Sequence, residues 1–195
     1  MILYFTINSP HQWVRLDSKG VHDSGQASEL SELPEAESCV AVVPGEQVVT
    51  RTETLPVKSR QKLLAAIPYA IEDSLVSPVD QLHFSVLHSG PENRVTFAYV
   101  DRGVMSQWLG QLNEAGLNVV SLVPDYLLLP GAVNGTAVIT SAGDNRIAIR
   151  GGQYRGVITS PGSFGNWLES LEEGSSIIAD KHLADSLPGE FLARE

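Results

Sequence analysis

One order of predicted elements occurs twice in this 195-residue chain, and it limits the fold more than any other feature. Short apolar runs separated by turn residues predict three strands, a helix and a fourth strand in each copy. The strands of the first copy are Ile2–Ile7, Gln12–Leu16, Val21–Ser24 and Ser38–Val43, with a helical turn or two in Ser28–Leu33. Those of the second are Ala137–Thr140, Arg146–Arg150, Tyr154–Thr159 and Ser175–Ala179, with a helix over Phe164–Leu171. The sequence therefore predicts an α/β fold of duplicated β-β-β-α-β units.

A different unit lies between the two copies. Val48–Leu55 and Gln81–Leu87 have the pattern of strands, and Lys58–Leu75 between them carries apolar residues at helical spacing. We predict an inserted α+β subdomain over residues 45–90 or so, within a first lobe of residues 1–130. Residues 131–195 then form a second, truncated lobe.

Two helices of the predicted fold differ in their local signals. Pro68 removes the N–H group that would bond to the carbonyl of Leu64, which predicts a break at about Ile67. The helix over Gly103–Ala115 carries apolar residues at i, i+3, i+4 and i+7, and Gly116 stands at the position of a C-terminal cap. We expect the second helix to be continuous.

Composition excludes several classes of function. The net charge of −10, from 13 basic and 23 acidic side chains, argues against a nucleic-acid binder. No apolar run approaches the roughly 20 residues that span a bilayer, and the first residues lack the pattern of a signal peptide. Cys39 is the single cysteine, which excludes an internal disulfide and favours a reducing environment such as the cytoplasm. The five histidines show no spacing typical of metal ligands.

Several segments resemble one protein family, in the right order over most of residues 10–160. They are Leu55-Pro56, QKLLAAIPYAIEDSL at 61–75, Val79–His83, Val104–Leu117, LVPDYLLLP at 122–130 and Arg150–Gly156. Together they resemble the cytoplasmic domain of type II secretion system protein L. That family has the actin-like, ribonuclease H-like fold of the sugar kinases and heat-shock ATPases, which agrees with the duplicated unit.

The resemblance implies a non-enzymatic scaffold of the inner-membrane platform, without a cofactor, at the cytoplasmic face of the bacterial inner membrane. The implied partners are the N-terminal domain of the secretion ATPase, protein E, and platform proteins M, C and F; a homodimer is compatible with it. The family continues through one transmembrane helix into a periplasmic domain. Because neither follows here, we expect this chain to be an excised cytoplasmic portion.

The alternative is an actin-like ATPase or a nucleotide-binding pilus-assembly protein of the M type. Such a site needs an Asp-Gly turn in each lobe, because carboxylates hold Mg²⁺ while glycine lets backbone N–H groups approach the phosphates. The first turn, Ile7–His11, has neither residue, and the second, Ser141–Asn145, has Gly143 and Asp144 in the wrong order. Only Gly143 and Asp144 remain as weak candidates for nucleotide contact, and we predict no ATP turnover.

Two further sites are suggested by residue pattern. Ser163, Asp180 and His182 have the chain order of a hydrolase triad, but Pro161 replaces a glycine of the nucleophile elbow and Ser163 is better explained as a helix N-cap. The inserted helix begins with basic residues and ends with acidic ones. The basic start fits a solvated face, or a docking surface for an acidic partner or for anionic lipid headgroups. We predict that this helix and its flanking strands bind the ATPase, with Arg60, Lys62, Glu72 and Asp73 as candidate contact residues; the alternative is that the insertion only caps the first lobe.

Overall fold

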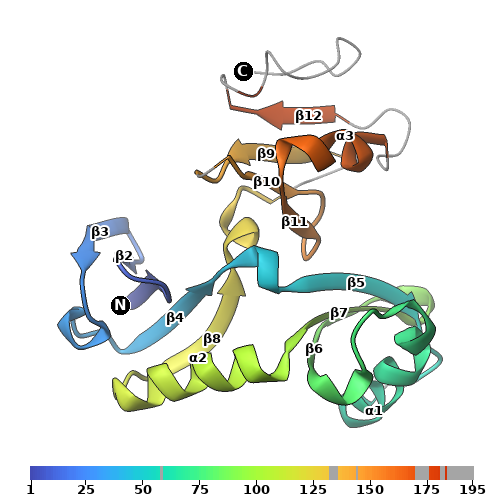
Figure 1. The fold of residues 1–195 in the computed structure, drawn as a ribbon. Coiled ribbons are helices and arrows are strands. Elements are labelled where there is room, and N and C mark those ends of the chain that lie inside the picture. Colours follow the sequence, from blue (N-terminus) through green and yellow to red (C-terminus); the bar gives the residue numbers. More distant parts are fainter. Residues whose placement is uncertain (58, 132–135, 144, 170–175, 181–182, 184–195) are drawn as a thin grey trace.

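Three β-sheets organise the molecule (Figure 1). The computed structural model describes the whole chain except residues 58, 132–135, 144, 170–175, 181–182 and 184–195. The first sheet has the order β3-β2-β1-β4-β8, the second β11-β10-β9-β12 and the third β5-β7-β6. The first two correspond to the predicted copies, and the third belongs to the insertion.

The duplicated unit is confirmed by the strand pairing. In the first copy, the central strand β1 (Ile2–Thr6) is antiparallel to β2 (His11–Asp17) and parallel to β4 (Ser38–Val43). In the second copy, β9 (Thr136–Ser141) is likewise antiparallel to β10 (Ile147–Arg150) and parallel to β12 (Ser176–Ala179). The outer strands are β3 (Gly20–Ala27) and β11 (Gly156–Thr159). Each copy therefore has the same topology.

The crossover segments of the two copies differ. The second copy has α3 (Pro161–Glu169), whose Phe164 and Leu168 pack into the core of the second sheet. The first copy has only the 3-10 turn η1 (Leu30–Glu32). Its sheet is covered instead by α2 (Arg102–Glu114), whose Trp108 and Leu112 are buried against the strands.

Helix α2 has the boundaries that its caps predict. The carboxylate of Asp101 accepts hydrogen bonds from the N–H groups of Gly103 (2.7 Å) and Val104 (3.1 Å), which satisfies two donors of the first turn. Gly116 has a φ of +67°, the left-handed conformation of a C-terminal cap. The chain then enters β8 (Val119–Pro124), which pairs parallel with β4, and the 3-10 turn η6 (Asp125–Leu128).

The insertion is a three-stranded antiparallel sheet with a helix on one face. Its strands are β5 (Val49–Thr54), β6 (Leu82–Ser89) and β7 (Arg94–Asp101). The predicted limit near residue 90 was too early, because β7 is the central strand of this sheet and extends the insertion to Asp101. The sequence does not reveal which sheet this strand joins. The 3-10 turns are η2 (Gly45–Gln47), η3 (Glu72–Ser74), η4 (Val79–Gln81) and η5 (Pro91–Asn93).

The predicted break at Pro68 is wrong. Helix α1 runs from Arg60 to Ile71 with Pro68 inside it. Its buried stripe, Leu63, Ile67 and Ile71, spans the proline and packs on the sheet. Each such side chain contributes about 1.5–3 kcal/mol when buried, which offsets the roughly 3 kcal/mol that an internal proline costs.

Candidate functional site

In the first candidate nucleotide-binding turn, Ile7–His11, hydrogen bonds within the protein engage the backbone N–H groups at both ends of the turn. The Oγ1 of Thr6 accepts the backbone N–H of Gln12 (2.8 Å), and the N–H of Ile7 donates to the carbonyl of Val42 (2.9 Å). His11 is only 6% exposed, and its Nδ1 lies 2.9 Å from the carbonyl oxygen of Thr6, to which it donates. These backbone donors therefore already have acceptors in the protein.

The second turn is closed in a similar way, but by a carboxylate. One carboxylate oxygen of Asp180, at the end of β12, accepts the N–H of Ser141 (2.8 Å) and the hydroxyl of Thr140 (2.9 Å). The N–H of Ala142 donates to the carbonyl of Arg146 (2.9 Å). A carboxylate in this position repels phosphate, and the N–H groups of Ser141 and Ala142 already have acceptors in the protein.

The two weak candidates for nucleotide contact have different outcomes. Gly143 lies in the second turn with a φ of +71°, and its carbonyl accepts the N–H of Arg146 (2.9 Å). Its backbone therefore serves the turn itself. Asp144 lies outside the described residues.

A buried tyrosine fills the junction between the lobes. Tyr126 is fully buried, and this burial raises the pKa of its hydroxyl to about 12. The hydroxyl donates a hydrogen bond to the carbonyl of Val48 (3.2 Å). The ring lies between Gly45 and Gly156: a Cβ atom on either glycine would be 2.4 Å from a ring carbon. No other residue type fits at these two positions without displacing the ring.

Charged groups surround this tyrosine. Arg146, from the second turn, forms an ion pair with Glu46 of η2 (2.8 Å), which links the two lobes. The carboxylate of Asp125 accepts the N–H groups of Tyr126 (2.7 Å) and Gly45 (3.2 Å), but burial raises its pKa above the ordinary value. The interlobe junction is thus occupied by the protein's own side chains.

The predicted protein-binding residues are exposed, but the structure does not bring them together. Arg60 and Lys62 lie in the first turn of α1, whereas Glu72 and Asp73 follow its last residue, Ile71. Twelve residues of α-helix span about 18 Å. Arg60 also reaches over the sheet, where its Nη1 donates to the carbonyl of Val86 (3.2 Å).

The hydrolase alternative receives no geometric support. Ser163 is the third residue of α3, which begins at Pro161, and the N–H of Ser163 donates to the carbonyl of Ser160 (3.0 Å). The expected N-cap role of Ser163 is therefore wrong, because the helix begins two residues earlier. Asp180 is bonded to the second turn, and His182 lies outside the described residues.

The described part of the chain shows neither a metal centre nor a membrane span. No three of its histidine, cysteine, aspartate or glutamate side chains gather closely enough to hold a metal ion. None of its helices is long and apolar enough to cross a bilayer.

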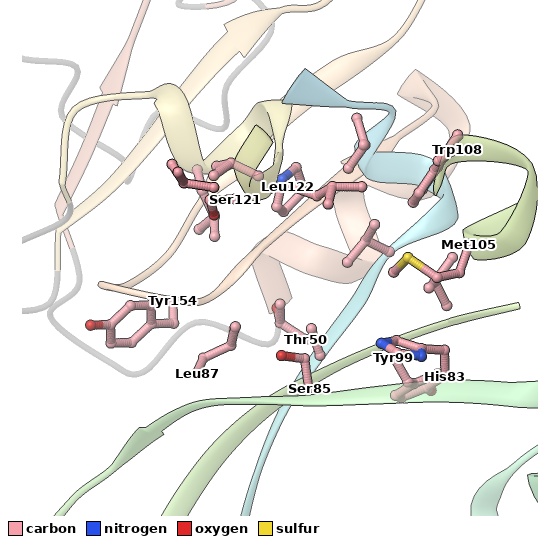
Figure 2. A pocket seen from close by; sticks show the side chains of 18 of the residues that line it. Thr50, His83, Ser85, Leu87, Tyr99, Met105, Trp108, Ser121, Leu122 and Tyr154 are labelled. Carbon is pink, nitrogen blue, oxygen red and sulfur yellow. The ribbon is translucent and has the colours of Figure 1, made fainter. Parts of the chain in front are cut away.

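An apolar cleft lies where the first lobe, the insertion and the second lobe meet. It has a volume of about 690 Å³ and is lined by α2, β8, the sheet of the insertion and the β10–β11 turn. Figure 2 shows Met105 and Trp108 on one side, Leu122 on another and His83 and Ser85 opposite them. His83 lines this cleft, and burial lowers its pKa. The alternation of apolar and polar residues along β6 does not indicate which element lies opposite the strand.

The chain resembles known proteins over most of its length. Residues 4–173 match the family pattern of type II secretion system protein L. The protein of this name from Dickeya chrysanthemi is 36% identical over 132 residues, which are 68% of this chain and 32% of that protein. This chain spans about a quarter to a third of the length of the curated relatives that it matches first.

Solved structures agree on the fold. The cytoplasmic domain of EpsL, an inner-membrane component of the type II secretion system of Vibrio cholerae, matches with a TM-score of 0.74 at 21% identity. That match covers 100% of this chain and 85% of the other. A PilM–PilN type IV pilus biogenesis complex matches with a TM-score of 0.60 at 15% identity, over 85% of this chain and 63% of the other. With its duplicated actin-like fold, the chain belongs to the type II secretion system protein L family.

Proposed function

We propose that this chain is a non-enzymatic adaptor at the cytoplasmic face of the bacterial inner membrane. It binds the N-terminal domain of the secretion ATPase, protein E, and joins platform proteins M, C and F. Membership of the protein L family supports the role in secretion. The observation that supports the non-enzymatic part is that side chains of the protein accept backbone N–H groups at both candidate nucleotide turns. Thr6 is the acceptor in one lobe and Asp180 in the other.

ATP turnover tests the non-enzymatic part. We expect phosphate release in the presence of ATP and Mg²⁺ to remain at background, and the melting temperature of the protein to be unchanged by the nucleotide. The contrary result is a steady-state rate that disappears in the Asp144→Ala variant, because that variant would identify a working site. Such a result would favour the alternative, an actin-like ATPase or a nucleotide-binding pilus-assembly protein.

The ends of α1 are the proposed docking surface for the ATPase. Basic residues at a helix N-terminus and acidic residues at its C-terminus both oppose the helix dipole, at about 0.3–1 kcal/mol each. Helix α1 has no acidic residue in its first turn and no basic residue in its last. Stability does not account for this arrangement, so we assign it to binding, together with the flanking segments Val48–Leu55 and Gln81–Leu87.

Charge reversal separates the two ends of this surface. Arg60→Glu with Lys62→Glu forms one variant, and Glu72→Lys with Asp73→Lys forms the other. Exposed Arg94 of β7 and exposed Glu114 of α2 provide matched control reversals away from these ends. Each reversal should change the free energy of unfolding by less than about 0.5 kcal/mol.

Binding to the purified N-terminal domain of the ATPase is then measured at low and physiological salt. Loss in the basic pair alone indicates an acidic partner surface, and loss in the acidic pair alone indicates a basic one. If both double variants bind like the parent, the helix surface is not the docking site. The adaptor role itself fails if the parent protein does not bind the ATPase domain.

A further inference from the structure

The cleft between α2, β8 and the insertion has features of a peptide-binding groove. Strand β8 is at the edge of the first sheet and, among the described residues, pairs only with β4. An unpaired strand edge offers a row of N–H and C=O groups to another chain. Five consecutive residues of β8, Val120–Pro124, line the cleft. Since alternate side chains of a strand point to opposite faces, an unbroken run indicates that the cleft runs along the edge of β8.

The opposite wall is the face of a sheet. His83, Ser85 and Leu87 alternate along β6 and line the cleft, while Phe84 and Val86 pack toward α1 on the other face. A peptide that lies between these two walls places its backbone beside the edge of β8. Its alternate side chains then point toward the face of β6.

The apolar lining is partly exposed. Val120 is 62% exposed and Leu109 is 49% exposed, although both side chains border the cleft. Met105 and Trp108 extend the apolar surface along α2, as Figure 2 shows. A ligand with two or more apolar side chains therefore gains by covering them.

The charges of the cleft have one sign in a strongly acidic protein. Its described lining contains Arg60 and Arg150 but no carboxylate, whereas the whole chain has a net charge of −10. Arg150 donates to the carbonyl oxygens of Leu127, Leu129, Gly152 and Gln153, all of them neutral acceptors. Arg60 donates to the neutral carbonyl of Val86, and no ion pair involves it in the described part of the chain. Both guanidinium groups keep uncompensated positive charge beside the cleft.

We propose that this cleft binds an extended segment of a partner protein, which adds a strand to the free edge of β8. The segment carries apolar side chains at alternate positions and at least one carboxylate that pairs with Arg60 or Arg150. Backbone hydrogen bonds to β8 supply affinity in this mode, while the pockets for alternate side chains supply specificity. The cleft shares Arg60 and part of β5 and β6 with the proposed docking surface for the ATPase, whereas Lys62, Glu72 and Asp73 lie outside its lining.

Selection from a random peptide library tests the proposal without a known ligand. The probe is a phage-displayed library of linear peptides of about 12 residues, selected on the parent protein. We expect the enriched peptides to share alternating apolar residues and an aspartate or glutamate. A library that yields no binder, or binders without this pattern, overturns the proposal.

Variants locate the bound peptide. A synthetic copy of the most enriched peptide should bind roughly tenfold more weakly to Val120→Glu, a loss of about 1.4 kcal/mol. It should also bind several-fold more weakly to Arg60→Glu. The matched controls are Val21→Glu, which changes an exposed valine on the opposite edge strand of the same sheet, and Arg94→Glu, which changes an exposed arginine of β7 outside the cleft lining. Melting temperatures confirm that each variant is folded. Equal loss in a variant and its control overturns the site.

Peptides with methylated backbone nitrogens distinguish a bound strand from other binding modes. Methylation of alternate peptide nitrogens removes donors on one edge, so one of the two alternating patterns should abolish binding and the other should not. Binding that survives both patterns overturns strand addition and indicates a different mode, such as a helix. Sedimentation velocity of the parent and the Val120→Glu variant covers the remaining case. A dimer that becomes a monomer in the variant shows that a second copy occupies the cleft, and it overturns a foreign segment.

Discussion

The two β-β-β-α-β units share strand order and direction but solve the same packing problem differently. In the second unit, the sheet is covered by its own crossover helix, α3, which inserts Phe164 and Leu168. The first unit has a single 3-10 turn at that place, and Trp108 and Leu112 of the later helix α2 contribute to its core. A sheet with one apolar face needs a cover, but the cover can come from a distant part of the chain. The two units therefore have the same strand topology, but the helix that covers the sheet comes from a different part of the chain in each.

The largest expected effect tests whether α2 covers the first sheet. Trp108→Ala should lower the free energy of unfolding by about 3–5 kcal/mol, because Trp108 is 4% exposed and its removal leaves a cavity under the first sheet. Phe164→Ala should cost a similar amount in the second unit. Denaturant unfolding, followed by a probe in each lobe, measures both. A loss below about 1 kcal/mol for Trp108→Ala contradicts the role of α2 as the cover of the first sheet.

The second effect tests the junction at which the two units meet. Gly156→Ala places a Cβ atom 2.4 Å from the ring of Tyr126 and 2.6 Å from the carbonyl oxygen of Ile149. We expect it to lower the free energy of unfolding by about 1–3 kcal/mol through overpacking. Gly165→Ala on α3 is the matched control, since no atom lies within 4 Å of its added Cβ. That change should stabilise the helix by about 0.5–1 kcal/mol. Equal signs for the two variants contradict a tight junction.

The third effect compares the two closed turns. Asp180→Ala removes a charged acceptor from three donors, the hydroxyl of Thr140 and the N–H groups of Ser141 and Leu183, and should cost about 1–3 kcal/mol. Thr6→Val removes one neutral acceptor and should cost about 0.5–1.5 kcal/mol. Asp180→Asn keeps an acceptor oxygen and should recover part of the loss. A larger loss for Thr6→Val than for Asp180→Ala reverses the comparison. Thermal or denaturant unfolding of the three variants decides it.

The smallest effect is a pH dependence at the junction. Because burial raises the pKa of Asp125 in the folded protein above its ordinary value of 3.8, its neutral form favours folding. Its contribution to stability is full below that ordinary value and is lost as the pH rises through the raised pKa. The Asp125→Asn variant should therefore gain stability relative to the parent as the pH rises. A difference in unfolding free energy between the two proteins that stays constant as the pH rises from below 3.8 contradicts this.

The local pattern of residues predicted most of the secondary structure. Apolar periodicity placed the strands of both units, and Gly116 marked the end of α2, because these features depend on a few adjacent residues. The continuity of α1 through Pro68 was missed, since the compensating burial of Ile71 arises only when the helix packs on a sheet. Sheet membership of β7 was missed for the same reason.

Sites formed by distant segments were the least predictable part. The closure of the second turn depends on Asp180, which reaches Ser141 only because β12 pairs with β9. The cleft depends on the edge of β8 facing the sheet of the insertion. The composition of the first turn was informative by itself, since Ile7–His11 lacks the residues of a phosphate-binding turn whatever its structure.

The position of β8 in the first sheet has a consequence for how the protein is made. β4 ends at Val43, but its parallel neighbour begins only at Val119, after the whole insertion. During synthesis at about 5–20 residues per second, the first sheet stays incomplete until α2 and β8 leave the ribosome. The strands of the insertion pair with one another and the insertion has its own core, so it can fold before the first sheet is complete. The exposed side of β4 is meanwhile an open strand edge, and a chaperone that binds nascent chains would find it there.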